Sequence, residues 1–439
     1  MKAILIPLYF KSGTDADFKN QVIKLRALLD DVALILEPIE LGSNLPRADA
    51  VIFPQLIGDA FKQIEQLKKI KIPFIVATSE FGAVNMWDWE IVSFFKSEGL
   101  AVFSPYNLGL TKKICKSLAL KEEMKSTKFL MFQDNPGVGM QAEIFKRFFW
   151  WEDRCTKFIK ERFGIEIIKK SFRDFGKRAM EIDNSTVNDF LKNRKIDTEG
   201  ISQNQLYSAV KICIQVIEEI EKDSSIKGVG INCLNESFFS DATPCLAWSL
   251  LYEEKKLLWA CEADTLSLMT MYLVNKSLDA HIMTSNIYPF LMGMAALKHE
   301  KIPEFPKVDF PQNYLLVAHC GYFGVVPQSF CSHWTVKPKV LDIVNENAIV
   351  LDARMPIGEI TVVKLDPSLS KLMVVEGVLK DYVQYPGSHC RNGAILEVKN
   401  GYKLMNAFYS HHNCLVVGHM LPFFENMAKI FNLEIEYIG

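Results

Sequence analysis

The chain has 439 residues, which at roughly 150 residues per domain suggests about three domains. Hydrophobic residues make up 49% and charged residues 23%, a balance that is typical of globular proteins and excludes disordered, collagen-like and coiled-coil chains. The 50 basic and 52 acidic residues give a net charge of −2, and no block of five like charges occurs. We therefore expect no nucleic-acid partner.

The sequence also predicts no membrane partner. The longest central stretch without charged side chains, 280–297, contains His281, Asn286 and Pro289 and is a poor membrane span. The ten cysteines lack paired C-x-x-C spacing, so most are expected to be small buried hydrophobic residues. The short apolar run at the N-terminus resembles a buried strand and not a cleavable signal, and we expect a cytoplasmic protein.

Strands and helices alternate over residues 1–125. Phe18, Val22, Leu25 and Leu29 recur on one helical stripe, and further helices are expected near 60–70 and 85–95. This alternation favours a parallel sheet with helices on both faces. The expected strands are 3–8, 32–36, 50–53, 74–77 and 100–103.

The pattern restarts after a Lys-rich connector, 112–128, and changes again near residue 313. The sequence predicts an α/β fold with two doubly wound parallel-sheet domains, 1–125 and 126–300, followed by a β-rich C-terminal domain, 301–439. Asn400-Gly401 suggests a type I′ hairpin turn, and 414–417 and 433–437 flank a last helix, 423–430. Strands are expected at 129–132, 164–168, 228–231, 257–261 and 280–283 in the second domain, and at 315–318, 348–351, 360–365, 372–378 and 394–398 in the third.

Carboxylates and imidazoles stand at the ends of predicted strands in the second half of the chain. Glu262 directly follows an apolar strand with Asp264 two residues on, His319 follows another strand, and His411-His412 precede a third. Carboxylate oxygens and neutral imidazole nitrogens suit Mn²⁺ and similar divalent cations. By contrast, the loop 134–140 lacks the glycine spacing of a nucleotide site and is expected to be a structural turn or a sugar contact.

These residues resemble the superfamily of L-fucose isomerase and L-arabinose isomerase. The order of the motifs and the three-domain texture cover almost the whole chain, with close matches at 228–297 and 410–419. The resemblance implies two α/β domains before a β-rich domain, and Mn²⁺ held by two carboxylates and one or more histidines. The matching motifs are Thr243-Pro244-Cys245, Trp259-Ala260-Cys261-Glu262-Ala263-Asp264, His319-Cys320, Ser410-His411-His412 and Val416-Val417-Gly418-His419.

The resemblance also implies individual roles. Glu262 matches the first carboxylate ligand and His412 the ligand histidine, while His319 is similar to a further histidine of the arabinose branch. Asn286, 24 residues after Glu262, stands where L-fucose isomerase has its second carboxylate. An amide can ligate a metal through its oxygen, but it cannot act as a base near neutral pH. Asp264 is the nearest acid that could replace the missing partner, or it could cap the following helix.

We therefore expect a metal-dependent aldose–ketose isomerase that acts on a sugar through a cis-enediolate, whose charge a divalent cation stabilises. Glu262 is the expected ligand and base, Asp264 and Asn286 are further catalytic candidates, and His411 is a candidate sugar contact. The alternative is a carbohydrate-binding homologue with altered or lost isomerase chemistry. A sugar-binding regulatory module and an unrelated metalloenzyme such as a hydrolase also remain open.

Two groups of aromatic residues suggest assembly. Trp87 and Trp89 begin a helix, and Phe148 to Trp151 are four adjacent aromatic residues on another. Aromatic side chains in this number are typical of interfaces. The resemblance implies a homo-oligomer, a hexamer or trimer, in which Trp87 and Trp89 cover the sugar pocket of a neighbouring subunit.

Overall fold

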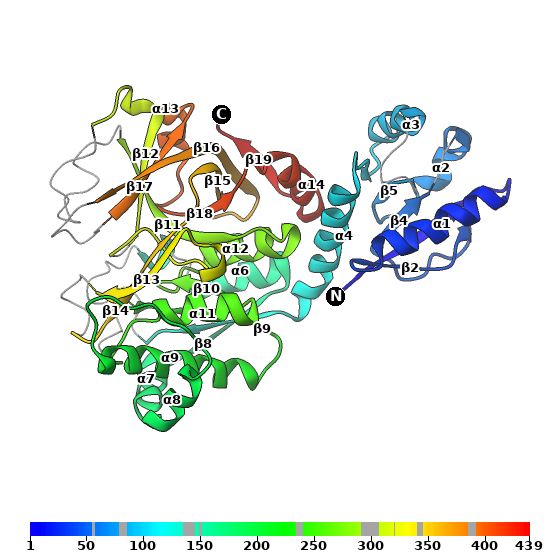
Figure 1. Cartoon of the computed structure of the whole chain (residues 1–439). Coiled ribbons are helices and arrows are strands. Elements are labelled where there is room, and N and C mark those ends of the chain that lie inside the picture. Colours follow the sequence, from blue (N-terminus) through cyan, green and yellow to red (C-terminus); the bar gives the residue numbers. More distant parts are fainter. Residues whose placement is uncertain are drawn as a thin grey trace. The chain divides into compact units, whose positions relative to one another are not determined.

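The chain contains two parallel sheets, each accompanied by helices, and one C-terminal, mainly antiparallel sheet (Figure 1). The computed structural model describes residues 1–54, 58–78, 86–134, 145–148, 152–233, 240–290, 307–319, 321–339, 346–384 and 392–439. These residues divide into two units. Unit 1 comprises Met1–Glu123, Lys276–Leu278 and Pro422–Asn432, and unit 2 comprises Met124–Asn275, Asp279–Leu421 and Leu433–Gly439.

Unit 1 contains a parallel sheet in the order β2-β1-β4-β5-β6, with β3 paired to β1. The predicted stripe of α1 is buried, and Asp15 caps the helix by accepting a hydrogen bond from the Phe18 N–H at 2.7 Å. The strands are β1 (Ala3–Tyr9), β2 (Ala33–Ile35), β3 (Ile39–Glu40), β4 (Ala50–Phe53), β5 (Phe74–Val76) and β6 (Val102–Phe103). The helices are α1 (Ala16–Leu29), α2 (Ile64–Leu67), α3 (Met86–Ser97), α4 (Leu108–Glu123) and α14 (Leu421–Phe431).

The expected connector at 112–128 is wrong, because most of it is helix. Leu110, Ile114 and Leu118 recur every four residues and are buried along α4. This apolar stripe is the signal of an amphipathic helix, and the many lysines between its members lie on the other faces.

Unit 2 begins with a second parallel sheet, in the order β10-β9-β7-β8. The strand β8 starts at Glu166, two residues later than expected, because Gly164 adopts a left-handed conformation (φ 84°) and ends α6. The strands are β7 (Lys128–Phe132), β8 (Glu166–Lys170), β9 (Ile226–Ile231) and β10 (Leu258–Cys261). The helices are α5 (Phe145–Phe148), α6 (Asp153–Phe163), α7 (Phe172–Met180), α8 (Asn184–Leu191), α9 (Gln203–Glu221), α11 (Cys245–Lys255) and α12 (Thr265–Leu278).

The C-terminal half of unit 2 is an antiparallel sheet that closes on itself. Its strands run in the order β15-β18-β11-β12-β17-β16, and β16 pairs again with β15, so the sheet resembles a barrel. β19 adds to β16 in parallel, and β13 and β14 form a separate pair. The bounds are β11 (Ile282–Pro289), β12 (Tyr314–Ala318), β13 (His333–Pro338), β14 (Ile349–Arg354), β15 (Gly358–Leu365), β16 (Lys371–Gln384), β17 (Asn392–Val398), β18 (His412–Val417) and β19 (Glu434–Tyr437), with helix α13 (Gly401–Ala407).

Two predictions for this half of the chain are wrong. The strand expected at 280–283 does not join the second parallel sheet, because Ile282 and Met283 belong to β11, which pairs antiparallel with β18 and β12. Asn400 does not form a hairpin turn. Its side-chain oxygen accepts a hydrogen bond from the Lys403 N–H at 3.0 Å and caps α13.

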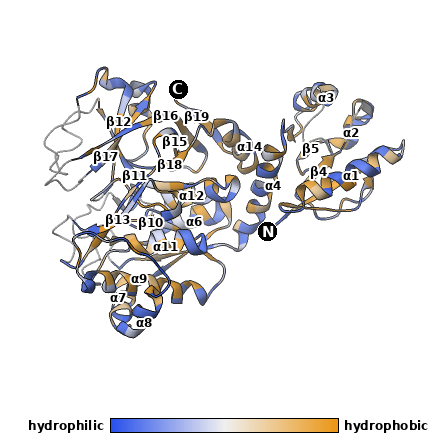
Figure 2. Cartoon of the chain, viewed as in Figure 1, coloured by the Kyte–Doolittle hydropathy of each residue, from blue (hydrophilic) through white to orange (hydrophobic). Residues whose placement is uncertain are grey.

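Hydrophobic residues are concentrated within the strands, as Figure 2 shows for β4 of unit 1. All described cysteines except Cys331 are buried, as expected. No helix within the described ranges is long and apolar enough to cross a membrane. Most of the loop 134–140 and of the aromatic run Phe148 to Trp151 lies outside the described residues, so the expectations for both stay predictions.

Candidate functional site

A tight turn holds Glu262 at the end of β10. Glu262 and Ala263 both adopt left-handed backbone conformations, with φ angles of 53° and 57°, and both are buried. Left-handed backbone at a residue other than glycine costs roughly 1–3 kcal/mol and persists only where the surroundings enforce it. Such strain is concentrated at functional sites, and here it fixes the direction in which the Glu262 carboxylate leaves the sheet.

Asp264 ends this turn and caps α12. Its Oδ1 accepts a hydrogen bond from the Ser267 N–H at 2.8 Å, and its Oδ2 accepts one from the Ser267 hydroxyl at 2.6 Å. The Lys364 Nζ lies 3.3 Å from the same Oδ2 and also donates to the Ser267 hydroxyl. Asp264 and Lys364 are both fully buried. The capping alternative for Asp264 is therefore confirmed.

His412, the first residue of β18, connects the two carboxylates. Its Nδ1 lies 3.0 Å from Asp264 Oδ2, and its Nε2 lies 3.7 Å from Glu262 Oε1. An ionised carboxylate can only accept hydrogen bonds, so Nδ1 must carry the proton in the contact with Asp264. The contact thereby fixes the orientation of the ring, and the Nε2 atom faces Glu262.

Charges alternate along this connection. Burial opposes the charge of Asp264, but the Lys364 ammonium and His412 outweigh it and hold the pKa of Asp264 well below its ordinary value. Burial also opposes the charge of Glu262, and His412, with smaller effects of His411 and His319, holds the pKa of Glu262 below its usual value. Burial alone would lower the pKa of His412, yet the hydrogen bond to Asp264 and the negative charge of the nearby Glu262 raise that pKa to about 9.

Asn286 lies beside His412 on the neighbouring strand. The two residues are directly paired across β11 and β18, so their side chains leave the sheet on the same face. The Asn286 Nδ2 donates to the Tyr288 hydroxyl at 3.2 Å. Its Oδ1 is buried and has no hydrogen-bond partner within the described part of the chain. A buried amide oxygen without a protein partner is costly unless a bound water molecule, ion or ligand satisfies it.

Two further histidines belong to the same group. His319 is buried and directly follows Ala318, which pairs with Asn286 across β12 and β11, and its charge helps to lower the pKa of Glu262. The His411 ring lies edge-to-face against His412, with 4.5 Å between the ring centroids. Burial and the neighbouring His412 lower the pKa of His411 to about 3, so this imidazole is neutral near pH 7.

The structure thus brings together Glu262, Asp264, Asn286, His319, His411 and His412 in unit 2. Trp87 and Trp89 lie on α3 of unit 1, and each is 63% exposed. The sequence did not point to Lys364 as a site residue, because it lies within a mainly apolar strand and not at a strand end.

Two buried amide residues were also missed. Gln133 directly follows β7, and Asn232 directly follows β9. These two strands are neighbours in the parallel sheet that also contains β10. Both are buried, and they carry amide atoms that lack hydrogen-bond partners among the described residues. Their positions directly after apolar strands are the signal that could have found them.

The residues present fit a divalent cation. The 3.7 Å between His412 Nε2 and Glu262 Oε1 is too long for a hydrogen bond and leaves room for an ion that binds both atoms. The unpartnered Asn286 Oδ1 supplies a third donor. The bond from His412 Nδ1 to a carboxylate is the usual support of a metal-binding imidazole. No three His, Cys, Asp or Glu side chains of the described ranges form a metal-binding group by themselves, so the set requires the amide.

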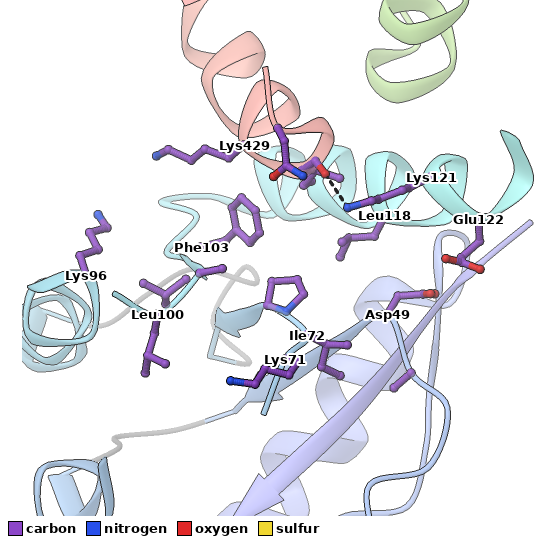
Figure 3. A pocket seen from close by; sticks show the side chains of 16 residues that line it. Asp49, Lys71, Ile72, Lys96, Leu100, Phe103, Leu118, Lys121, Glu122 and Lys429 are labelled. Atoms are coloured by element: carbon purple, nitrogen blue, oxygen red, sulfur yellow. Dashed lines mark hydrogen bonds between the residues drawn. The ribbon is translucent and has the colours of Figure 1, made fainter. Parts of the chain in front are cut away.

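A separate cavity of about 730 Å³ lies in unit 1 and contains none of these residues (Figure 3). Its wall combines apolar side chains such as Phe103 and Leu118 with lysines, of which Lys121 donates to the Ile430 carbonyl at 2.9 Å. The other labelled lysines, Lys71, Lys96 and Lys429, are exposed. Because these amines are exposed, the cavity is a weaker candidate than the buried cluster of unit 2.

Comparison with known protein families and with characterised proteins finds no match to this chain. The resemblance to sugar isomerases therefore depends on the motif residues described above.

Proposed function

We propose that this chain is a metal-dependent aldose–ketose isomerase similar to L-fucose isomerase. Glu262, Asn286 and His412 would hold the cation, whereas His319 does not complete a metal-binding group with Glu262 and His412 among the described residues. The observation that carries the proposal is the buried connection of Glu262, His412 and Asp264 beside the unpartnered Asn286 oxygen. The two parallel sheets followed by a barrel-like sheet agree with the order of domains that the resemblance implies.

The reaction exchanges a carbonyl and a hydroxyl group between C1 and C2 of a sugar. When bound, the Mn²⁺ ion stabilises the negative charge of the cis-enediolate as a Lewis acid. Glu262 removes the proton from one carbon and returns it to the other, since its ionised carboxylate is held in a fixed direction by the strained turn. His411, neutral near pH 7, can form a hydrogen bond with a sugar hydroxyl. The Asp264 carboxylate already forms hydrogen bonds with Ser267, Lys364 and His412. We therefore assign it the role of orienting His412 and not the role of base.

The direct test uses the purified full chain, freed of metal and reloaded with Mn²⁺. It is offered a panel of pentoses, hexoses and deoxysugars, and ketose formation and bound metal are measured. Stoichiometric Mn²⁺ together with ketose formation from at least one aldose supports the proposal. Absence of both metal binding and turnover contradicts it.

One observation favours a second function, that of a carbohydrate-binding homologue with altered chemistry. Asn286 stands where the resemblance implies an acid, and an amide cannot take a proton from carbon. In that case the same experiment would give sugar binding, for example by calorimetry, without ketose formation.

We further propose that the chain acts in the cytoplasm as a homo-oligomer, either a hexamer or a trimer. Phe61, Met86, Trp87 and Trp89 of unit 1 are each at least 63% exposed. Large apolar side chains that are exposed together on a globular protein often mark a partner, and the resemblance makes that partner a second copy of the chain.

Replacing Trp87 by Ala is expected to reduce turnover more than it reduces stability. The side chain is 63% exposed in its own chain, so its removal leaves no core cavity, whereas it would uncover the sugar pocket of a neighbouring subunit. Turnover, light scattering and chemical denaturation measure the three effects. Trp259→Ala is the control, because Trp259 is buried and its truncation should cost about 3–5 kcal/mol of folding free energy. A fully active monomer, or a Trp87→Ala variant with lost stability and normal specific activity, would contradict the proposal.

A further inference from the structure

Lys364 is fully buried in a strand of the barrel. Its neighbours Val362, Val363 and Leu365 on β15 are buried apolar residues, as expected for such a strand. A buried ammonium group is tolerated only where charge and hydrogen bonds compensate the loss of water. The described partners of Lys364 are Asp264 Oδ2, at 3.3 Å, and the Ser267 hydroxyl.

The position of Lys364 couples it to His412 through Asp264. Asp264 Oδ2 receives the Lys364 ammonium, the Ser267 hydroxyl and the His412 Nδ1. Because all three point at one oxygen, the direction of that oxygen decides how the imidazole is held. The lysine comes from β15, the aspartate from the start of α12 and the histidine from β18, so three elements meet at one atom.

We propose that Lys364 is a positioning residue, which holds the Asp264 carboxylate in place so that His412 keeps Nδ1 toward Asp264 and Nε2 toward Glu262. The consequence for Mn²⁺ rests on the proposed function, whereas the orientation of the ring does not. Loss of a carboxylate that supports a metal-binding imidazole weakens metal affinity on the order of tenfold to a hundredfold.

The competing explanation is that Lys364 only neutralises Asp264 for the sake of folding. Both explanations predict that Lys364→Met lowers stability, because Asp264 would remain buried without a counter-charge. They differ in the folded protein. If Lys364 orients His412, then loss of the lysine changes the hydrogen bonding of the imidazole ring and the affinity of the site for metal. These changes persist even when no buried charge is left without a counter-charge.

The test compares three full-length variants with the wild type. Lys364→Met removes the ammonium, and the double variant Asp264→Asn/Lys364→Met removes both charges, so it is expected to fold if the single variant does not. Glu219→Gln is the control, because Glu219 is also a buried carboxylate paired with cations, Lys170, Arg178 and Lys222, and it is not part of the site. It should lower stability without touching His412.

Two measurements are made on each folded variant. Mn²⁺ affinity is followed by electron paramagnetic resonance of the free ion. The ring of His412 is followed by ¹⁵N NMR of the metal-free chain at a fixed pH, with its signals identified by their loss in His412→Asn. We expect Lys364→Met, or the double variant, to bind Mn²⁺ about tenfold or more weakly and to lose the hydrogen-bonded Nδ1 signal. Glu219→Gln should match the wild type in both.

Unchanged ring signals in both lysine variants would overturn the proposal, whatever happens to stability or affinity. Changed ring signals with unchanged Mn²⁺ affinity would overturn its consequence for metal binding. A wild type that binds no Mn²⁺, while its His412 signals depend on Lys364, would refute the proposed function and leave the positioning role standing.

Discussion

Changing Glu262 to Gln is expected to abolish isomerase turnover and to weaken the retention of Mn²⁺. Glutamine has nearly the same shape, but it has neither the charge that faces His412 nor the basicity that proton transfer from carbon requires. Loss of a general base alone lowers rates about 10²–10⁴-fold, and loss of a ligand adds to this. Metal content is measured on the purified chain, and turnover is measured with the best aldose of the panel.

Two controls separate this effect from general damage. Glu219→Gln also converts a buried carboxylate into an amide, and it should keep both metal and turnover. His412→Asn places an amide nitrogen near the position of Nδ1, so the contact with Asp264 can persist while the Nε2 atom is lost. It should lose metal, whereas His333→Gln, at a half-exposed histidine on β13, should not. Unchanged metal content in both Glu262→Gln and His412→Asn would refute the site.

Asn286→Asp is expected to preserve Mn²⁺ binding and to raise isomerase activity on at least one sugar. The buried Oδ1 without a partner would become part of a carboxylate beside His412, and the Tyr288 hydroxyl can donate to it in place of accepting from Nδ2. The substitution therefore supplies the second acid that the resemblance implies, at small structural cost. Initial rates of ketose formation across the sugar panel measure the gain.

Asn413→Asp is the matched control. Asn413 adjoins His412 on β18 and is also buried with an unpartnered side-chain oxygen among the described residues, but strand alternation directs it to the other face. Its amide donates to the Ser410 carbonyl at 3.0 Å, so the aspartate should lower stability without raising activity. A well-folded Asn286→Asp protein with unchanged metal affinity and turnover would place Asn286 outside the site.

The sequence predicted the individual elements better than it predicted which sheet they join. The stripe of α1 and the strands that end at Cys261 and Ala318 follow from local hydrophobic patterns. β11 was placed in the wrong sheet, since a strand of buried residues gives no sign of its partners. Asn400 was misread because Asn suits both a turn and a helix cap.

For the candidate site, strand ends and motif resemblance pointed to Glu262 and His412, which the structure places 3.7 Å apart. They could not reveal Lys364. Its partner Asp264 is 100 residues away in the sequence, and a lone lysine in an apolar strand usually signals an exposed edge. The role of Asp264 was likewise open, because only the fold shows how many donors surround its carboxylate.

The closed barrel has a consequence for biosynthesis. Asp264 and His412 are separated by 148 residues, and β18 joins β15 to β11 near the end of the chain. During translation the N-terminal parts of a chain fold first, and contacts between distant residues form slowly. The two parallel sheets can therefore take shape while Glu262 still lacks the strand that carries His412. A nascent or prematurely terminated chain that stops before residue 412 would fold in part, yet it would hold no complete site, so the proposed activity would appear only when synthesis is almost finished.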